Sequence, residues 1–412
     1  MDYIRDNKIT DKREQMIKAL YYVRHRSYNR FVELIIAQDM GNFLPCDTDY
    51  IILDENSFVY YMAGVAKRLD INYDVIVATE EYNGSIDDLL LESNVRYGLR
   101  FNFPEPLYFF NLSAHVQADN FPQYLEGTDI YLMNVENDKK LDAITTERLP
   151  VTTAADNTSF EKMTIQFSDD FSTMDIDRTL DFTGHFKTQE LDNRVFFGDY
   201  LNEEFTRYGT AHFYRCKKKQ SKYYKDIENK VNASMRTYKE RNDEDLEKAV
   251  SANFDTKVND YSHRVTNLGR YSKDALSIND QISLENNYFK KAGPNYIMEI
   301  GKLIGGQVQI DEDEVERTHD IYLEFAKTYK FEIDLTIPDG YEVVGLDKLK
   351  KSRSNTTGSF KSTAEIQGNT LKLTSKKVYA KRKYAASDWS QMIDWLRVAY
   401  DFSQEKIMFR KK

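Results

Sequence analysis

The segment from Asp54 to Thr79 constrains the fold of this chain most, because it predicts a helix that leads directly into a buried strand. Asp54 or Asn56 can cap the helix, since a side-chain oxygen at that position accepts from first-turn N–H groups. A β-branched run over residues 73–79 is typical of a packed strand. The apolar residues that recur at helical spacing are Phe58, Met62, Val65 and Leu69.

This pattern resembles the core of transglutaminase-like proteins, the papain-type group with a Cys-His-Asp triad. More narrowly, it is similar to envelope proteins of Bacteroidota in which Gly-Asp-Cys opens the helix and Leu-Gly-Ile closes it. Counted back from Leu69-Asp70-Ile71, the opening motif falls on Leu53-Asp54-Glu55. The aspartate is kept, but Glu55 stands where the resemblance implies the nucleophilic cysteine.

Glu55 removes the sulfur on which that chemistry depends. A catalytic cysteine belongs at a helix N-terminus because the helix dipole and a paired histidine favour the thiolate. A glutamate is also stabilised by the positive helix end. We therefore interpret Glu55 as a first-turn acid that preserves the helix start; a carboxylate nucleophile is the alternative.

The other two triad positions also depart from the pattern that the resemblance implies. The family's Phe-Asn-His motif aligns with residues 93–95, which puts Val95 at the position of the base. Its Trp-Leu-Asp-Pro-Thr stretch aligns with residues 109–113, which puts Asn111 at the position of the aspartate. An asparagine can orient a histidine in papain-like proteases, so Asn111 by itself does not exclude catalytic activity. With Glu55, Val95 and Asn111 taken together, we expect no catalytic residues.

Two alternatives stay open at this point. The first is an active thiol amidase or acyl transferase that uses Cys46, nine residues before Glu55, with His115 as a displaced base. The second is a peptide or glycan binder whose aromatic cleft uses residues 108–110, although the strand spacing of these rings favours a place in the core.

The last third of the chain predicts strands and a late helix. Residues 358–366 and 370–379 flank the turn Gln367-Gly368-Asn369 and predict a hairpin. Ser387 is expected to cap a helix that carries Trp389. This pattern resembles the C-terminal domain of unknown function that follows the transglutaminase-like domain in the same proteins. Just before it, the apolar spacing over residues 296–304 predicts another helix.

The predicted fold class is α+β, with a transglutaminase-like (papain-type) domain followed by a β-sandwich-like region that carries a charged helical insertion. We expect a degenerate transglutaminase-like domain at residues 1–150. A short β segment and a charged helical region follow at 151–275. The C-terminal β-rich domain with its late helix takes residues 276–412.

Composition narrows the classes of function. The net charge is −10 and the pI is about 5.3, which argues against a nucleic-acid partner because such binding needs a basic face. No apolar run approaches 18 residues, so no transmembrane segment is expected. Two cysteines, Cys46 and Cys216, cannot form a disulfide framework.

The histidines show no metal-ligand spacing, and we expect neither a metal nor a cofactor. His185 and His212 are interpreted as structural, and His25, in the run Arg24-His25-Arg26, as solvent-exposed.

The resemblance implies a place in the periplasm or cell envelope, although residues 1–6 carry no signal peptide. It also implies a further β-rich domain before this chain, so we expect a piece of a longer protein. The leading hypothesis is a catalytically inactive protein that acts in binding or scaffolding. Its partner would be a protein, peptide or glycan of the envelope.

Overall fold

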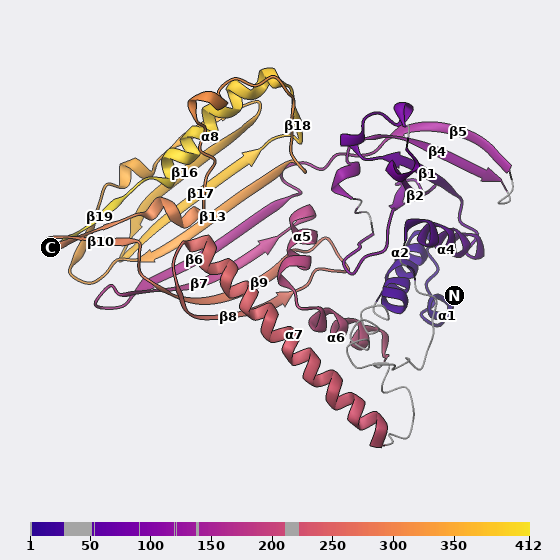
Figure 1. Ribbon diagram of the computed structural model, residues 1–412, viewed down its shortest axis with the longest axis horizontal. Helices are drawn as coiled ribbons and strands as arrows, with labels where there is room; N and C mark the ends of the chain where they lie inside the picture. Colours follow the sequence, from indigo (N-terminus) through magenta and orange to yellow (C-terminus); the bar gives the residue numbers. More distant parts are fainter. Residues whose placement is uncertain are drawn as a thin grey trace. The chain divides into compact units, whose positions relative to one another are not determined.

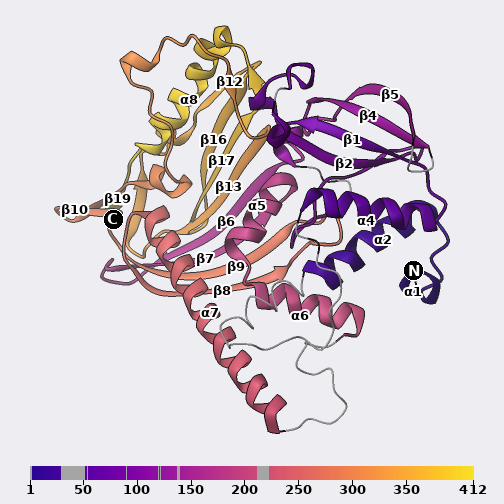
Figure 2. The same cartoon turned by 45° about the vertical axis from the view of Figure 1, so that its right-hand side comes forward.

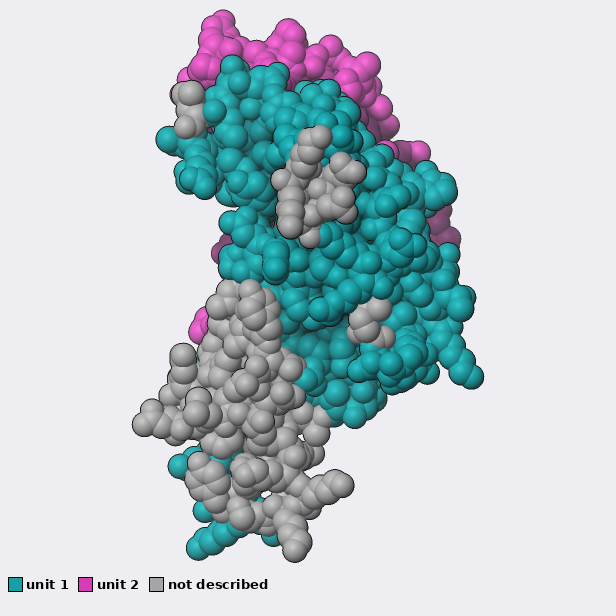
Figure 3. All heavy atoms as spheres, turned by 90° about the vertical axis from the view of Figure 1, so that its right-hand side faces the viewer, with its two compact units in different colours: residues 1–151, 195–241, 270–272 teal, residues 152–194, 242–269, 273–412 magenta. Residues whose placement is uncertain are grey.

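A computed structural model describes residues 2–28, 52, 54–89, 91–118, 120, 122–136, 140–210 and 222–412. The chain divides into two compact units, which Figure 3 colours separately. Unit 1 comprises residues 1–151, 195–241 and 270–272, and unit 2 comprises residues 152–194, 242–269 and 273–412. The residues predicted to form a middle region, 151–275, are thus shared between the units.

Unit 1 is built on a five-stranded antiparallel sheet with the strand order β3-β2-β1-β4-β5. Its strands are β1 (Tyr73–Thr79), β2 (Val95–Phe101), β3 (Leu107–Phe109), β4 (Asp129–Glu136) and β5 (Lys140–Arg148). Its main helices are α1 (Asp2–Asp6), α2 (Lys12–Val23), α4 (Glu55–Arg68) and α6 (Phe197–Tyr208). Short helical turns are η1 (Arg24–Tyr28), η2 (Glu81–Asn83), η3 (Ile86–Asp88), η4 (Glu92–Asn94) and η5 (Gln123–Leu125).

Helix α4 packs its apolar stripe against one face of this sheet, as the sequence predicts. Phe58 and Met62 are fully buried and share a core with Leu99 and Phe101 of β2. Helix α2 lies beside α4 on the same face (Figure 2). A smaller core that includes Ile76 covers the opposite face. The helix-to-strand segment is therefore the centre of unit 1.

Unit 2 is built on an eight-stranded sheet with the order β15-β16-β17-β13-β6-β7-β9-β8 (Figure 1). Its strands are β6 (Thr158–Phe167), β7 (Thr173–Phe182), β8 (Val258–Asn267), β9 (Leu276–Glu285), β13 (Lys327–Thr336), β15 (Ser352–Asn355), β16 (Gly358–Gln367) and β17 (Thr370–Tyr379). Strands β13 and β6 run parallel, and every other pair is antiparallel. The predicted boundary at residue 275 falls between β8 and β9, which are paired strands of this sheet.

The sheet of unit 2 has one apolar and one polar face, because side chains alternate along each strand. Helix α8 and a four-stranded sheet share a core with the apolar face. The smaller strands are β10 (Phe289–Ala292), β11 (Asn295–Met298), β12 (Ile321–Tyr322), β14 (Tyr341–Val344), β18 (Lys383–Tyr384) and β19 (Ile407–Lys411). The helices are α5 (Gly184–Arg194), α7 (Lys222–Phe254, which continues from unit 1), α8 (Trp389–Ser403), η7 (Ile300–Ile304), η8 (Glu312–Glu314), η9 (Leu346–Leu349) and η10 (Ala386–Asp388).

The predictions for the last third are correct in part. The hairpin of β16 and β17 forms, and Gly368 at its turn has a φ of 62°, a conformation that favours glycine. The helix predicted over residues 296–304 is wrong for its first half. Tyr296 and Ile297 instead lie in β11, because Tyr296 pairs with Phe409 of β19, and this tertiary pairing overrides the local periodicity. The observed class is α+β, as predicted.

Candidate functional site

Helix α4 begins where the sequence predicts, and Asp54 is its cap. The Oδ1 atom of Asp54 accepts from the backbone N–H of Ser57 at 2.8 Å, and the Ser57 hydroxyl donates to Oδ2 at 2.8 Å. These hydrogen bonds to the charged form lower the pKa of the Asp54 carboxyl below its usual value. The capped start fixes the direction of the residue that follows, Glu55.

Glu55 points toward strand β2. Its Oε2 atom accepts a hydrogen bond from the backbone N–H of Tyr97 at 3.2 Å. Burial raises the pKa of Glu55, while the Tyr97 N–H and the nearby Arg96 oppose that rise and Glu80 adds to it. The pairing of β2 with β3 ends at Leu99, which lies opposite Phe109. Tyr97 is not paired with any described residue of β3, and its N–H donates to Glu55.

Three further side chains surround Glu55 and form, with it, what we call the carboxylate cluster: Glu55, Glu80, Arg96 and Tyr124. The guanidinium of Arg96 holds Glu80 through Nε and NH2, each 2.7 Å from Oε1. Glu80 is 5% exposed. Among the described residues, its Oε2 atom is buried without a hydrogen-bond partner. Burial, Glu55 and Glu80 raise the pKa of Tyr124 to about 12, so its phenol stays protonated.

The sequence did not reveal Glu80, Arg96 and Tyr124 as members of a site. Glu80 directly follows β1, and Arg96 pairs with Ala78 across the β1–β2 register. That register brings two residues together that are 16 positions apart. A charged residue directly after a buried strand was the one available signal.

Val95 and Asn111, which the sequence alignment put at the positions of the base and the orienting aspartate, carry side chains that cannot move a proton as an imidazole does. Val95 is the first residue of β2, directly before Arg96, and it is half-buried. Asn111 lies two residues after the end of β3 and is also half-buried. Glu55 contacts strand β2 at Tyr97, which is two positions after Val95.

His115 has a different environment from Glu55. The groups that shift its pKa are Arg270, Arg24 and Glu204, whereas Glu55 responds to Tyr97, Arg96 and Glu80. His115 is 2% exposed, and its ring meets the Tyr200 ring edge-on at 5.0 Å. Burial and the two arginines lower its pKa to about 3, which makes the imidazole a weak base at neutral pH.

Several predicted residues lie outside the described part of the chain or in the core. Cys46, Cys216 and His212 are outside the described residues, so the pairing of Cys46 with His115 stays a prediction. The rings of residues 108–110 are all buried, with at most 8% exposure. The Tyr108 hydroxyl donates to Glu147 at 2.6 Å. These rings belong to the two cores of unit 1, and a binding cleft formed by them stays a prediction.

His25 was predicted to be exposed and is instead 3% exposed. It belongs to a buried charge cluster in which Arg24 and Arg270 both bind Glu204, at 3.0 and 2.6 Å. The Nδ1 atom of His25 lies 3.4 Å from the other oxygen of Glu204. The sequence could not show this burial of His25, because Glu204 is 180 positions away from the neighbouring Arg24. His185 is also buried, and its backbone N–H donates to the Oδ1 atom of Asn157 at 2.9 Å.

A groove of about 600 Å³ is lined by α4 and by residues of β1 and β2. Tyr60 projects from α4 and is 83% exposed. Lys67 and Arg68 lie at the far end of α4, opposite the carboxylate cluster. Tyr97, whose N–H holds Glu55, also lines the groove, so the groove begins beside that cluster. The lining residues are Asn56, Val59, Tyr60, Tyr61, Ala63, Gly64, Val65, Lys67, Arg68, Tyr73, Val75 and Tyr97.

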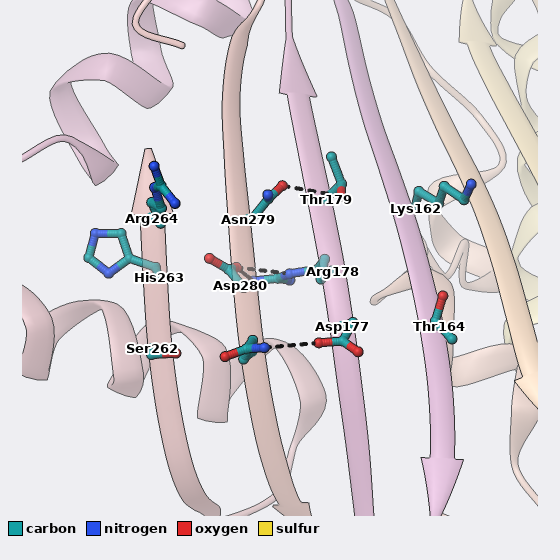
Figure 4. A pocket seen from close by; sticks show the side chains of 11 residues that line it. Lys162, Thr164, Asp177, Arg178, Thr179, Ser262, His263, Arg264, Asn279 and Asp280 are labelled. Carbon is teal, nitrogen blue, oxygen red and sulfur yellow. Dashed lines mark hydrogen bonds and ion pairs between the residues drawn. The ribbon is translucent and has the colours of Figure 1, made fainter. Parts of the chain in front are cut away.

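A second, polar depression of about 500 Å³ lies on the sheet of unit 2 (Figure 4). The Thr179 hydroxyl donates to Asn279 at 3.3 Å, and Gln281 donates to Asp177 at 3.4 Å. The side chains around it thus bind one another across the strands. We interpret this surface as the solvated face of an antiparallel sheet. Within the described residues, no three His, Cys, Asp or Glu side chains gather as a metal site requires.

Comparison with known proteins gives a match for part of the chain. Residues 305–409 match DUF3858, a domain of unknown function, and this agrees with the C-terminal resemblance in the sequence. The chain is also similar to a solved structure from Parabacteroides distasonis that is provisionally named a protease, with 10% identity and a TM-score of 0.38. That alignment covers 98% of this chain and 56% of the other, so this chain spans little more than half of that protein's length. No curated protein matches the chain.

Proposed function

We propose that this chain is a non-catalytic, transglutaminase-like protein that binds an extended polypeptide along helix α4. One observation carries the proposal: the carboxylate of Glu55 accepts from the Tyr97 N–H at the head of α4, at 3.2 Å. In a transglutaminase-like enzyme that position would hold a thiolate at the positive end of the helix. Glu55 joins the start of α4 to strand β2 without supplying a thiol.

The groove beside Glu55 supports a binding role. Helix α4 has 14 residues and is therefore about 20 Å long, which corresponds to roughly six residues of an extended peptide. Exposed Tyr60 offers an aromatic anchor of the kind that dominates many interfaces. The carboxylate cluster lies at one end of the groove, and Lys67 and Arg68 lie at the other. Charge complementarity therefore favours a peptide with a basic residue near Glu55 and acidic residues near Arg68.

Peptide binding tests this role directly. The probe is a short, fluorescein-labelled peptide of threonine and valine with lysine at one end and two aspartates at the other. We expect saturable binding that Tyr60→Ala weakens by about tenfold or more, and that Arg68→Glu also weakens. The control Tyr322→Ala removes a ring of unit 2 that is 54% exposed and should leave affinity unchanged. Equal affinity of the wild type for an uncharged peptide would contradict the assigned polarity, and no binding would contradict the role.

An enzymatic assay tests the absence of catalysis. Glutamine-containing peptides and small amides are incubated with the chain and with two variants, Cys46→Ala and Glu55→Gln. We expect no turnover above background in any of them. Turnover that disappears in Cys46→Ala would overturn the proposal in favour of a thiol enzyme. Turnover lost only in Glu55→Gln would instead assign a carboxylate nucleophile.

We further propose that the protein acts in the bacterial cell envelope, which is the location that the transglutaminase-like resemblance implies. Within the described residues, none of the helices combines the length and the apolar character that crossing a bilayer requires. Fractionation of cells that produce the natural gene product tests the location. Recovery with the cytosolic marker alone would contradict it.

A further inference from the structure

Two lysines lie diagonally across from each other on the apolar face of the eight-stranded sheet in unit 2. The β13–β17 register pairs Lys327 with Tyr379 and Tyr329 with Lys377. Directly paired residues, and residues two apart along a strand, point to the same face. The four side chains therefore form a square with lysines at one pair of opposite corners and tyrosines at the other.

Aromatic rings surround both amines. The Nζ atom of Lys377 lies 5.3 Å from the centre of the Tyr329 ring and 5.6 Å from that of Tyr379. The Nζ atom of Lys327 lies 5.3 Å from the Phe325 ring and 5.9 Å from the Tyr379 ring. Ring faces attract an ammonium through their quadrupole. They carry no net charge, however, and so cannot neutralise it.

The polar groups near the two amines leave their charge uncompensated. Lys377 donates to the amide oxygen of Gln307 at 2.7 Å. Glu324 is the carboxylate that acts on Lys327 from a distance, and its own Oε2 accepts from Gln189 at 3.0 Å. Within the described part of the chain, no ion pair joins Lys327 or Lys377 to a carboxylate.

The environment of the two amines lowers the pKa of both. Burial, together with the charge of Lys327, lowers the pKa of Lys377 to about 8. Burial also lowers the pKa of Lys327, which Glu324 only partly offsets. Two partly desolvated cations that repel each other are unfavourable unless an opposite charge joins them.

We infer that Lys327 and Lys377 form a binding site for an oxyanion, either a carboxylate or a phosphoryl group, within the part of the chain that matches DUF3858. An oxyanion supplies the negative charge that the rings and Gln307 lack, and it accepts charge-assisted hydrogen bonds from both amines. Tyr329 and Tyr379 would form the walls of the site. The site belongs to unit 2 and does not depend on the proposed function of the α4 groove.

The test uses the whole chain labelled with ¹³C at the lysine Cε. Lys327→Met and Lys377→Met assign the two resonances, because methionine preserves the length and packing of the side chain. Inorganic phosphate and succinate are titrated separately, with sodium chloride keeping the ionic strength constant. Lys372→Met is the matched control, since Lys372 lies on the opposite face of β17 and pairs with Asp334 at 3.0 Å.

We expect one of the anions, or both, to shift the Lys327 and Lys377 resonances saturably and to raise the pKa of Lys377. Either methionine variant at these two positions should weaken the binding by about tenfold or more, and Lys372→Met should leave it unchanged. A response to phosphate alone assigns a phosphoryl group, and a response to succinate alone assigns a carboxylate. No saturable response to either anion would overturn the inference. Binding by the Lys327→Met and Lys377→Met variants as tight as that of the wild type would also overturn it.

Discussion

Arg24 and Glu204 form an ion pair in which neither side chain is exposed, with Nε 3.0 Å from Oε1. The same oxygen binds Arg270 at 2.6 Å. Arg24 also donates to the carbonyl of Val116 at 2.7 Å. Through Arg24, this carboxylate of α6 is linked to the start of η1 and to the segment after β3. The fold of unit 1 therefore depends on a charge that water does not solvate.

Glu204→Gln should destabilise the protein strongly at neutral pH. The substitution leaves Arg24 buried without its anion and leaves Arg270 with Glu203 alone, and removing one partner of a buried pair costs about 3–5 kcal/mol. Urea denaturation followed by circular dichroism measures the loss. The control is Glu203→Gln, next in sequence, whose side chain is 26% exposed and binds Arg270 at 3.0 Å. That variant should lose no more than about 1 kcal/mol, and equal losses would contradict the central place of Glu204.

The contribution of Glu204 should depend on pH in the acid range. Burial alone would raise its pKa, but the His25 hydrogen bond and the two arginines outweigh burial and lower the pKa to about 2. A carboxyl whose folded pKa is depressed stabilises fully above its unfolded pKa and loses that effect as pH falls toward the folded value. The stability difference between wild type and Glu204→Gln should therefore shrink from about pH 4.5 to pH 2. A difference that stays constant over this range would show that the buried group is not ionised.

Local features of this fold could be predicted from sequence, because they depend on neighbouring residues. The cap at Asp54, the apolar stripe of α4 and the turn at Gly368 each follow from a short pattern. Pairings across long distances could not be predicted. Strand β6 pairs in parallel with β13, so that Thr158 lies beside Thr328, and no local pattern encodes that register.

The candidate site shows the same division. Glu55 was located because it opens a predictable helix. Its hydrogen-bond donor is the backbone N–H of Tyr97, and every residue except proline has such a group, so composition carries no signal for it. Glu80 and Arg96 meet only through the β1–β2 register. The burial of His25 likewise depends on Glu204, which belongs to a distant helix.

The free energy of unfolding should increase as the pH rises above 8, because Lys377 then loses its buried charge. Its folded pKa is lowered to about 8 from an ordinary value of 10.5, so the unfolded chain binds more protons between these values. Stability rises with pH wherever the unfolded state binds more protons. Unfolding free energies measured from pH 7.5 to pH 10 should therefore rise for the wild type relative to Lys377→Met. Parallel curves for the two proteins would contradict the lowered pKa.

Gly358→Ala should destabilise unit 2, because the space for a side chain at Gly358 is already filled. A Cβ atom there would lie 2.2 Å from the carbonyl oxygen of Val378 on the paired strand and 2.8 Å from the Trp395 ring of α8. The backbone of a central strand cannot yield easily, so we expect a loss of about 2–3 kcal/mol. Thermal and urea unfolding, followed by tryptophan fluorescence, measure it. Gly306→Ala is the matched control, since nothing lies within 4 Å of its Cβ position, and its effect should stay within about 0.5 kcal/mol. Equal stability of the two variants would mean that β16 and α8 separate more readily than their packing indicates.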